Sequence, residues 1–222
     1  MKAKLTLIPT PIDEVTPLEA TAKNILSENW SKALIVVEEA KVARQRWLRW
    51  GLPREAIEKF VLYNEHHTAE DINHIIKALK SGQEAYLMSD CGLPAFCDPG
   101  YDLINRCHDE NIPVTSTPFP NSIVLALALS GFNHQEFFFA GFIPHEDRAQ
   151  KLKKHFERKE TFILMDTPYR LDKLMEEIAQ LKTKRRLFLA MDLNTPEEKC
   201  VRGKIETLKK TWGKREFILV VE

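Results

Sequence analysis

The strongest constraint on the fold is an alternation of short apolar runs with amphipathic segments along the first half of the chain. The apolar runs are rich in Val, Ile and Leu, which is typical of strands buried on both faces. The amphipathic segments have helical spacing, and the one that opens at Thr68 has Asp71 three residues later and Gly82 as a stop signal. The predicted strands are 5–11, 32–39, 59–67, 84–90 and 113–118, and the predicted helices are 17–29, 40–51, 68–83 and 100–112. This rhythm predicts a mainly parallel sheet with helices on its faces.

A second series of elements follows the proline-rich stretch at 118–120. It begins with an apolar helix at 120–131. The elements predicted after it are strands at 136–143, 160–166, 185–193 and 215–222 and helices at 146–160 and 169–181. We therefore expect two α/β lobes, 1–117 and 118–222, with mainly parallel or mixed sheets.

The charge of the chain is unevenly distributed. Residues 1–117 carry 13 basic and 17 acidic residues, whereas residues 118–222 carry 19 basic and 15 acidic residues. A basic second half suits an anionic partner such as nucleic acid. The N-terminal apolar stretch is too short for a signal peptide, and no run reaches the roughly 18 apolar residues of a membrane span. We expect a soluble, cytoplasmic protein with no membrane partner.

The most unusual stretch is SDCGLPAFCDPGYDL at 89–103. Its cysteines, Cys91 and Cys97, have neither the CxxC spacing of a redox pair nor a second Cys/His pair at zinc-finger spacing. The chain also lacks the phosphate-binding pattern GxxxxGK[ST] and the dinucleotide-binding pattern GxGxxG. We therefore expect no metal, and the four cysteines do not form a disulfide framework.

The position of this stretch is more informative than its cysteines. It follows a predicted parallel strand, and open α/β sheets bind ligands at that end of their strands. Gly92 permits close backbone approach, and Asp90 at the strand tip is predicted to contact the ligand. Asp98 is predicted to cap the next helix, with Pro99 at its first position.

Two further stretches have the same character. Thr10 lies between two prolines directly after the first predicted strand. Asn121 and Ser122 open the apolar helix, where the free N–H groups of a helix start favour a polar ligand. Ser122 is equally explained as a plain N-cap.

Several motifs occur in the order and spacing of one known family. They are LIPTPI, YNEHH, LMSDCGLPAFCDPGYDLI, IPVTSTPFPNSIVLALALSGF, EFFFAGFIP, TFILMDTPYRL and VRGKIETL. In these motifs, which span nearly the whole chain, the sequence resembles the tetrapyrrole-methylase superfamily of S-adenosylmethionine-dependent methyltransferases. Within that superfamily it is most similar to the bacterial 16S ribosomal RNA (cytidine-2′-O)-methyltransferases. The resemblance implies two α/β lobes, S-adenosylmethionine in a cleft between them, and a homodimer.

The resemblance also implies which residues bind the methyl donor. Asp90 and Leu93 would contact its sugar and methionine parts, and Met165 and residues 192–195 would lie near the adenine, largely through backbone groups. The implied donor-binding residues are Pro9, Thr10, Pro11, Asp90, Leu93, Asn121, Ser122, Ile123, Met165, Asn194 and Thr195.

The chain departs from the usual motifs of the ribosomal RNA enzymes. Those enzymes usually show ATPIGNL, AEDTR and PGPSA, where this chain has PTPIDEV, VEEAK and PFPNS. Asp13 replaces a glycine, Ala40 a threonine and Lys41 an arginine. These departures concern the methyl acceptor. The alternative that the chain belongs to a divergent subfamily with another substrate therefore stays open.

The expected reaction is methylation of a ribose 2′-hydroxyl of small-subunit ribosomal RNA, with rRNA or the small ribosomal subunit as partner. Two alternatives stay open: a methylase of a tetrapyrrole-like small molecule, and an S-adenosylmethionine-binding module without turnover. The small-molecule enzymes carry a GxGPGD-type loop that this sequence lacks.

A ribose hydroxyl is a poor nucleophile, so a base would assist the transfer. The titratable candidates at strand ends are Glu39, Glu65 and His66, each of which is equally explained as a capping or surface residue. A basic run on the second predicted helix meets phosphates or forms a solvated helix face. That run consists of Lys41, Arg44, Arg46 and Arg49.

Overall fold

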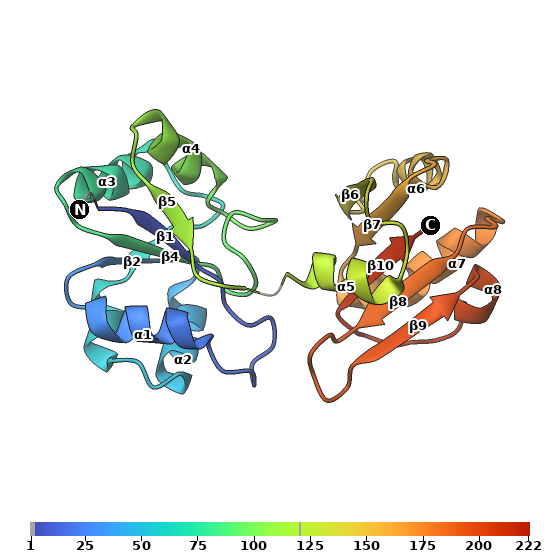
Figure 1. Cartoon of the computed structure of the whole chain (residues 1–222), viewed down its shortest axis with the longest axis horizontal. Coiled ribbons are helices and arrows are strands. Elements are labelled where there is room, and N and C mark those ends of the chain that lie inside the picture. Colours follow the sequence, from blue (N-terminus) through green and yellow to red (C-terminus); the bar gives the residue numbers. More distant parts are fainter. Residues whose placement is uncertain (1–2, 120) are drawn as a thin grey trace. The chain divides into compact units, whose positions relative to one another are not determined.

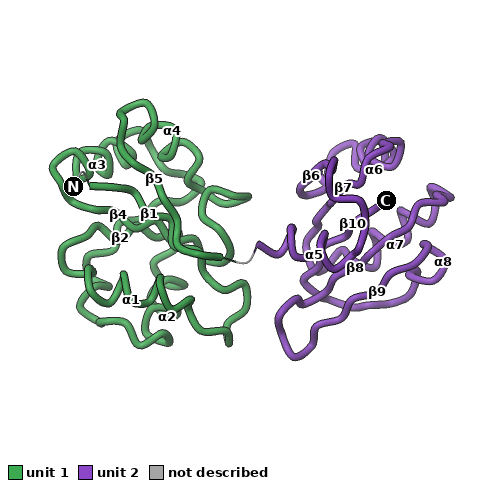
Figure 2. Tube along the Cα trace, viewed as in Figure 1, with its two compact units in different colours: residues 1–119 green, residues 120–222 purple. Residues whose placement is uncertain are grey.

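The computed structural model describes residues 3–119 and 121–222. Pro120, where the apolar helix is predicted to start, lies outside the described residues. The chain divides into two compact units, unit 1 (Met1–Phe119) and unit 2 (Pro120–Glu222) (Figure 2). Each unit has one five-stranded sheet with helices packed against it (Figure 1).

Unit 1 is built on a parallel sheet with strand order β3-β2-β4-β1-β5. Its strands are β1 (Leu5–Ile8), β2 (Leu34–Val37), β3 (Val61–Leu62), β4 (Ala85–Met88) and β5 (Val114–Ser116). Its helices are α1 (Ala20–Asn29), α2 (Ala40–Arg49), the 3₁₀ helix η1 (Arg54–Lys59), α3 (Ala69–Lys80) and α4 (Tyr101–Asp109).

Helices cover both faces of this sheet, which explains why its strands are so apolar. On one face α1 and α2 pack against Ile8, Ile35 and Met88. On the other face α3 and α4 pack against Leu5 and Leu87 (Figure 1). Because successive strand residues point to opposite faces, each central strand contributes to both cores. The all-buried strand β4 is the clearest case.

The predicted start of α3 is confirmed in detail. The Thr68 hydroxyl accepts a hydrogen bond from the Asp71 N–H, and the Asp71 carboxylate accepts one from the Thr68 N–H, so the two residues form a capping box. The strand predicted at 59–67 is shorter than expected. Only Val61 and Leu62 pair with β2, at the edge of the sheet.

Unit 2 has a mixed sheet with strand order β6-β7-β10-β8-β9. Strands β6 and β7 are parallel, and the other neighbouring pairs are antiparallel. Its strands are β6 (Phe137–Phe142), β7 (Thr161–Met165), β8 (Leu187–Met191), β9 (Lys199–Gly203) and β10 (Phe217–Val221). Its helices are α5 (Ser122–Ser130), α6 (Arg148–Phe156), the 3₁₀ helix η2 (Pro168–Arg170), α7 (Leu171–Gln180) and α8 (Ile205–Leu208).

The helices of unit 2 divide between the two faces of its sheet. Helix α5 packs against Ile163 and Ile218, while α6, α7 and α8 pack against Leu164 and Leu219. The sequence did not predict β9 or α8. Strand β9 is mostly exposed, and it forms by pairing along the whole length of β8.

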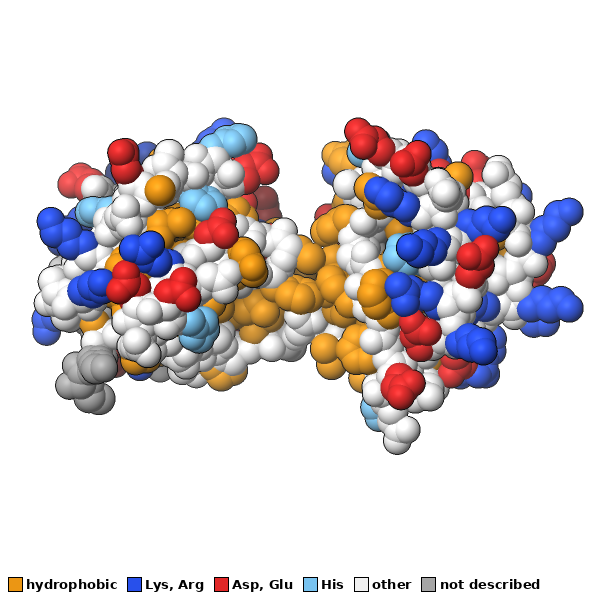
Figure 3. All heavy atoms as spheres, turned by 90° about the horizontal axis from the view of Figure 1, so that it is seen from above, with side chains coloured by type: hydrophobic (Ala, Val, Ile, Leu, Met, Phe, Trp, Pro, Cys, Tyr) orange, Lys and Arg blue, Asp and Glu red, His pale blue; other side chains and the backbone are white. Residues whose placement is uncertain are grey.

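No helix in the ranges 3–119 and 121–222 is both long and apolar enough to cross a membrane. On the face of unit 2 that Figure 3 shows, Lys and Arg side chains are spread with acidic side chains among them.

Candidate functional site

The loops that leave β1 and β4 lead to helices on opposite faces of the sheet. The two strands are parallel neighbours, paired from Leu5–Ala85 to Ile8–Met88. Helix α1, which follows β1, packs on one face of the sheet, and α4, which follows β4, packs on the other. In open α/β sheets such a divergence leaves a crevice at the carboxyl ends of the two strands, where ligands bind. The candidate ligand site of unit 1 therefore lies at the loops after β1 and β4.

Two backbone hydrogen bonds join these loops. The Thr10 N–H donates to the Gly92 carbonyl (2.8 Å), and the Gly92 N–H donates to the Thr10 carbonyl (3.0 Å). Thr10 is fully buried, and its hydroxyl donates to the Ser89 carbonyl at 3.2 Å. Gly92 has φ of 82°, a conformation that favours glycine. The structure thus brings together Thr10 and Gly92, two residues that the sequence analysis singled out separately.

Three carboxylates converge beside this junction, and we call Glu38, Asp90 and Asp98 the acidic edge. The Asp90 N–H donates to Glu38 Oε2 (3.1 Å), and Asp90 Oδ1 accepts from the Glu39 N–H (3.2 Å). Burial and the nearby Glu38 carboxylate raise the pKa of Asp90 to about 6. Burial and Glu38 also raise the pKa of Asp98 to about 6. Such an edge favours a ligand that offers positive charge or hydrogen-bond donors.

The described ranges contain no group of three His, Cys, Asp or Glu side chains placed to hold a metal ion.

The prediction that Asp98 caps the next helix is wrong. The N-cap of α4 is Gly100, which has φ of 139° and provides no side-chain cap. A Cβ at Gly100 would stand 2.8 Å from the Ala95 Cβ, so glycine is required for the chain to pass this close to itself. Asp98 instead faces Gly92, with its Oδ2 3.8 Å from the position that a Gly92 Cβ would occupy.

Two members of the basic run on α2 hold the loop after β1. Arg46 is 9% exposed, and its Nη1 donates to the Pro11 carbonyl at 2.5 Å. Arg49 donates to the Glu14 carbonyl and pairs with the Glu14 carboxylate at 3.2 Å. Arg46 is therefore a buried residue that holds the loop after β1. It is neither part of a solvated helix face nor placed to bind a phosphate. The other two basic residues of the run are exposed.

Asp13, which stands where the family usually has glycine, shapes the same loop. Its Oδ1 accepts from the N–H groups of Val15 (2.6 Å) and Thr16 (2.7 Å), and its Oδ2 accepts from the Thr16 hydroxyl (2.7 Å). A side-chain turn of this kind replaces backbone hydrogen bonds of an ordinary turn. The aspartate at this position therefore fixes the loop through its own side chain.

The structure separates the three acid–base candidates. Glu65 and His66 follow the edge strand β3, are 80% and 84% exposed, and lie 3.6 Å from each other. Strand β3 pairs with β2, and the described contacts of Glu65 and His66 are with each other and with Asn64 rather than with Asp90. Glu39 is also exposed, but its backbone N–H contacts Asp90. Of the three, only Glu39 adjoins the acidic edge.

In unit 2, Met165 and residues 192–195, which are expected near the adenine, lie at the same end of the sheet, because β7 and β8 run in the same direction. Met165 ends β7, and its carbonyl accepts from the Ile143 N–H at 3.1 Å. Residues 192–195 follow β8 in a sharp turn, in which Asp192 has φ of 45° and Asn194 has φ of 64°.

Hydrogen bonds inside this turn already engage part of its backbone. The Thr195 N–H and hydroxyl both donate to the Asp192 carbonyl, at 3.1 and 2.8 Å. The Asn194 N–H donates to Glu198 Oε2 at 2.7 Å. Internal hydrogen bonds therefore hold the turn. Contacts of Asn194 and Thr195 with the methyl donor would use groups other than these two N–H groups and the Thr195 hydroxyl.

Asn121, rather than Ser122, caps α5. Its Oδ1 accepts from the N–H groups of Ile123 (2.9 Å) and Val124 (3.2 Å). Ser122 is the first helical residue, so the N-cap explanation offered for Ser122 is wrong. The amide nitrogen of Asn121 is the part of that side chain free of the capping role.

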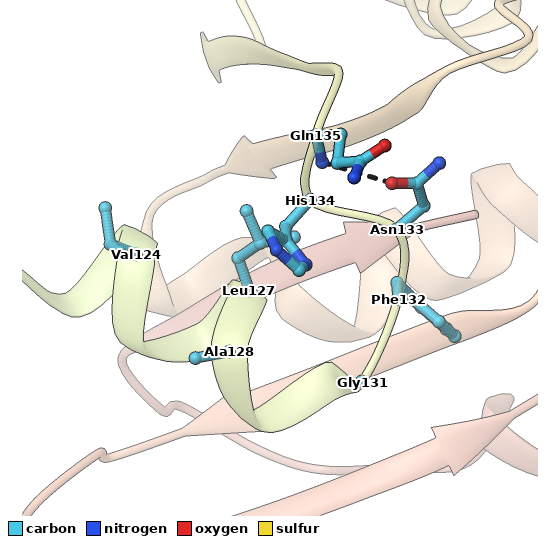
Figure 4. Close-up of a pocket in the computed structure, with 8 residues that line it drawn as sticks. All are labelled: Val124, Leu127, Ala128, Gly131, Phe132, Asn133, His134 and Gln135. Atoms are coloured by element: carbon cyan, nitrogen blue, oxygen red, sulfur yellow. Dashed lines mark hydrogen bonds between the residues drawn. The ribbon is translucent and has the colours of Figure 1, made fainter.

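A pocket of about 830 Å³ lies between α5 and the segment that follows it (Figure 4). Leu127 and Ala128 line it from the helix, and Asn133, His134 and Gln135 line it from the following segment. The Gln135 N–H donates to Asn133 Oδ1 at 3.1 Å, which shapes this segment. The residues that line the pocket differ from the predicted donor-binding set.

Sequence reasoning missed Glu38 and Ser89. Glu38 directly follows the last residue of β2, and Ser89 directly follows the last residue of β4. The Ser89 hydroxyl donates to the Cys91 carbonyl (3.1 Å) in the loop that carries Asp90. A usable signal was present, because both residues are the first polar ones beyond a parallel strand.

The fold and this site define the chain as a two-unit α/β protein with an acidic edge beside the loops after β1 and β4. The profile of the family described as tetrapyrrole (corrin/porphyrin) methylases matches residues 18–209. The chain therefore belongs to the tetrapyrrole methylase family, a family of methyltransferases, and the predicted resemblance is confirmed.

Two similar proteins are each named ribosomal RNA small subunit methyltransferase I. The one from Hydrogenobaculum sp. is 30% identical and covers 98% of this chain and 95% of the relative. The one from Thermotoga maritima is 28% identical and covers 91% and 88%.

Solved structures share the fold at low sequence identity. Diphthine synthase superimposes with a TM-score of 0.68 at 14% identity, covering 99% of this chain and 89% of that one. Uroporphyrin-III C-methyltransferase from Thermus thermophilus, complexed with S-adenosylhomocysteine, gives 0.56 at 15% identity, covering 99% and 97%. The predicted fold, with two α/β sheets, is confirmed.

Proposed function

We propose that this methyltransferase uses S-adenosylmethionine and that its acceptor is a ribose 2′-hydroxyl of small-subunit ribosomal RNA. The observation that carries the donor assignment is the acidic edge at the divergence of β1 and β4. Family membership and the S-adenosylhomocysteine in the Thermus enzyme support the donor. The names of the two bacterial relatives support the RNA acceptor.

The residues of the acidic edge fit this donor. S-adenosylmethionine carries a sulfonium, an ammonium group and two ribose hydroxyls, which are either positive or donate hydrogen bonds. Carboxylates accept such bonds strongly, and nearby positive charge favours the ionised forms of Asp90 and Asp98. Gly92 presents its backbone without a side chain, and only the Asp98 carboxylate lies within 4 Å of its Cβ position. A ligand can therefore approach the loop closely.

When bound, S-adenosylmethionine supplies an electrophilic methyl group on sulfur. Because transfer is an in-line displacement, the main task of the chain is alignment. The paired bonds between Thr10 and Gly92 hold two walls of the site in fixed register. The Glu39 N–H holds Asp90 Oδ1, and we assign Asp90 Oδ2 as the acceptor for a ribose hydroxyl of the donor.

The proton of the acceptor hydroxyl needs a destination. Among the three candidates Glu39 adjoins Asp90, and we propose that its carboxylate takes up this proton. The substitution Glu39→Gln should lower kcat while leaving the donor Kd unchanged. The substitution Glu65→Gln is the matched control, because it removes an exposed carboxylate whose described ion pair is with His66 and not with the acidic edge.

One experiment tests donor and acceptor in sequence. Calorimetry with S-adenosylhomocysteine should give binding to the wild type, weaker binding to Asp90→Ala and unchanged binding to Asp109→Ala, an exposed aspartate on α4. Labelled methyl transfer to small ribosomal subunits from a strain that lacks the enzyme then tests the acceptor. Absence of donor binding would overturn the proposal. Donor binding without transfer to rRNA would favour a small-molecule methylase or a binding module.

The family resemblance also supports a homodimer, which we propose as the assembled form. Sedimentation velocity over a dilution series tests it, and a monomer at every concentration would overturn it.

A further inference from the structure

A second group of residues gathers at the edge of the unit 2 sheet where β7 and β8 end and β10 begins. Residues 209–215 read KKTWGKR and lead into β10. In the sheet, Phe217 pairs with Met191 at the end of β8, and Leu219 pairs with Leu164 near the end of β7. The segment 209–215 therefore lies at the edge that also carries the residues implied near the donor adenine.

This segment is fixed to its surroundings. The Asp172 carboxylate at the start of α7 accepts from the N–H groups of Trp212 (2.7 Å) and Gly213 (3.2 Å). The Trp212 indole N–H donates to the Leu208 carbonyl at 2.9 Å. Arg215 Nε donates to Asp192 Oδ2 at 2.5 Å, which ties the segment to the turn at 192–195. The carboxylates of Asp172 and Asp192 are thereby engaged within the protein.

Lysine ammonium groups lie over two aromatic rings at this end of the sheet. Lys214 Nζ lies 4.3 Å from the centre of the Tyr169 ring, and Tyr169 is 76% exposed. Lys210 Nζ and Lys199 Nζ lie 4.3 and 5.4 Å from the centre of the Trp212 ring. All three lysines are exposed, and in the described part of the chain none of them forms an ion pair. We call these five residues the basic-aromatic surface.

We propose that the basic-aromatic surface binds a single-stranded segment of the RNA acceptor, an inference that rests on the proposed function. A base stacks on the exposed ring of Tyr169, and phosphates contact Lys199, Lys210 and Lys214. Stacking on an aromatic ring combined with lysine contacts to the backbone is the general mode of single-strand binding. The overall excess of basic residues in unit 2 favours the same anionic partner.

The charge part is tested by fluorescence anisotropy with a labelled RNA of about 12 nucleotides, within the usual site size of single-strand binding surfaces. The triple variant Lys199→Gln/Lys210→Gln/Lys214→Gln should reduce the slope of log Kd against log salt by about 2, since each phosphate contact contributes roughly 0.7. The control is Lys151→Gln/Lys153→Gln/Lys154→Gln, which makes the same charge change on exposed positions of α6. An equal loss in both triple variants would overturn the proposal.

The stacking part is tested at Tyr169. Tyr169→Leu should weaken RNA binding roughly 5- to 150-fold, because stacking contributes about 1–3 kcal/mol per base. Tyr169→Phe keeps the ring and should bind like the wild type, whereas equal loss in both variants would exclude stacking.

Calorimetry with S-adenosylhomocysteine and methyl transfer to small subunits are measured on the same proteins. A wild type that methylates rRNA, together with triple and Tyr169→Leu variants that bind RNA normally, overturns this inference alone. A wild type that neither binds RNA nor methylates rRNA overturns the acceptor assignment as well.

Discussion

Replacing Asp90 by asparagine should stabilise the protein and weaken donor binding at the same time. The change removes one charge from the acidic edge while keeping the shape of the side chain. The amide oxygen introduced by Asp90→Asn can still accept from the Glu39 N–H, and the backbone bond to Glu38 is untouched. The perturbation is therefore almost purely electrostatic.

The size of the effect follows from the pKa of Asp90, which burial and Glu38 raise from 3.8 to about 6. A shift of about two units corresponds to roughly 3 kcal/mol. Because the carboxylate is partly exposed, solvent screening reduces this to about 1–2 kcal/mol. A raised pKa means that the folded chain binds the proton more tightly than the unfolded chain. The penalty is absent below pH 3.8, grows between 3.8 and about 6, and is complete above about 6.

Urea unfolding of the wild type and Asp90→Asn measures this directly. The variant should be more stable by about 1–2 kcal/mol at neutral pH, and the difference should disappear near pH 4, where the wild-type carboxyl is largely protonated. The affinity for S-adenosylhomocysteine should fall roughly 5- to 30-fold, because hydrogen bonds to a charged acceptor exceed those to a neutral one by about 1–2 kcal/mol. A variant that is less stable at neutral pH, or a difference that persists at pH 4, would refute the electrostatic reasoning. Asp109→Asn, at an exposed position, should change neither quantity.

Three further substitutions test the packing and the ion pairing of the fold. Gly100→Ala should destabilise the protein by more than about 2 kcal/mol, because φ is 139° and the new Cβ would stand 2.8 Å from Ala95. Gly213→Ala has φ of 76° but open space, so urea unfolding should show a cost of only about 1 kcal/mol, and equal costs would contradict the argument. Arg148→Ala should cost about 3–5 kcal/mol, because it leaves the Asp166 carboxylate, 1% exposed and 2.5 Å from Arg148 Nη2, without that charge partner. If Arg148→Ala has a urea-unfolding midpoint close to that of the wild type, the Arg148–Asp166 ion pair is not needed for stability.

The sequence predicted the parallel sheet of unit 1 well because the strands of such a sheet are buried on both faces. The run AYLM, for example, is apolar throughout and forms all of β4. The same signal is missing from β9, whose residues KCVRG are mostly exposed at the edge of the second sheet. Its pairing with β8 supplies the stability that its own side chains do not. Such a strand forms because it pairs with its neighbour, so its own residues lack the apolar pattern that predicts a strand.

Local patterns misled where distant contacts decide the outcome. DPG at 98–100 has the local form of a helix start, yet Gly100 is the cap because the loop passes too close to Ala95 for a side chain. Arg46 has the spacing of an exposed helix face, yet its long side chain turns toward the Pro11 carbonyl 35 residues away in the sequence. The candidate site was found at Thr10 and Asp90 because the ends of parallel strands share one edge of a sheet.

The buried carboxylates of the two units differ in their ion pairing, and this difference supports a ligand at the acidic edge. In unit 2, Arg148 pairs with both Asp166 (2.5 Å) and Glu177 (2.8 Å), so buried negative charge is balanced within the fold. At the acidic edge of unit 1 the described residues form no such ion pair, and the pKa of Asp90 is raised. Arg46 of α2 partly offsets the raised pKa of Asp90, but its guanidinium donates to the backbone carbonyl of Pro11. Carboxylates held together without an ion-pair partner are unfavourable for stability alone. Their retention is explained if a ligand with positive charge and hydroxyl donors completes the edge, as S-adenosylmethionine would.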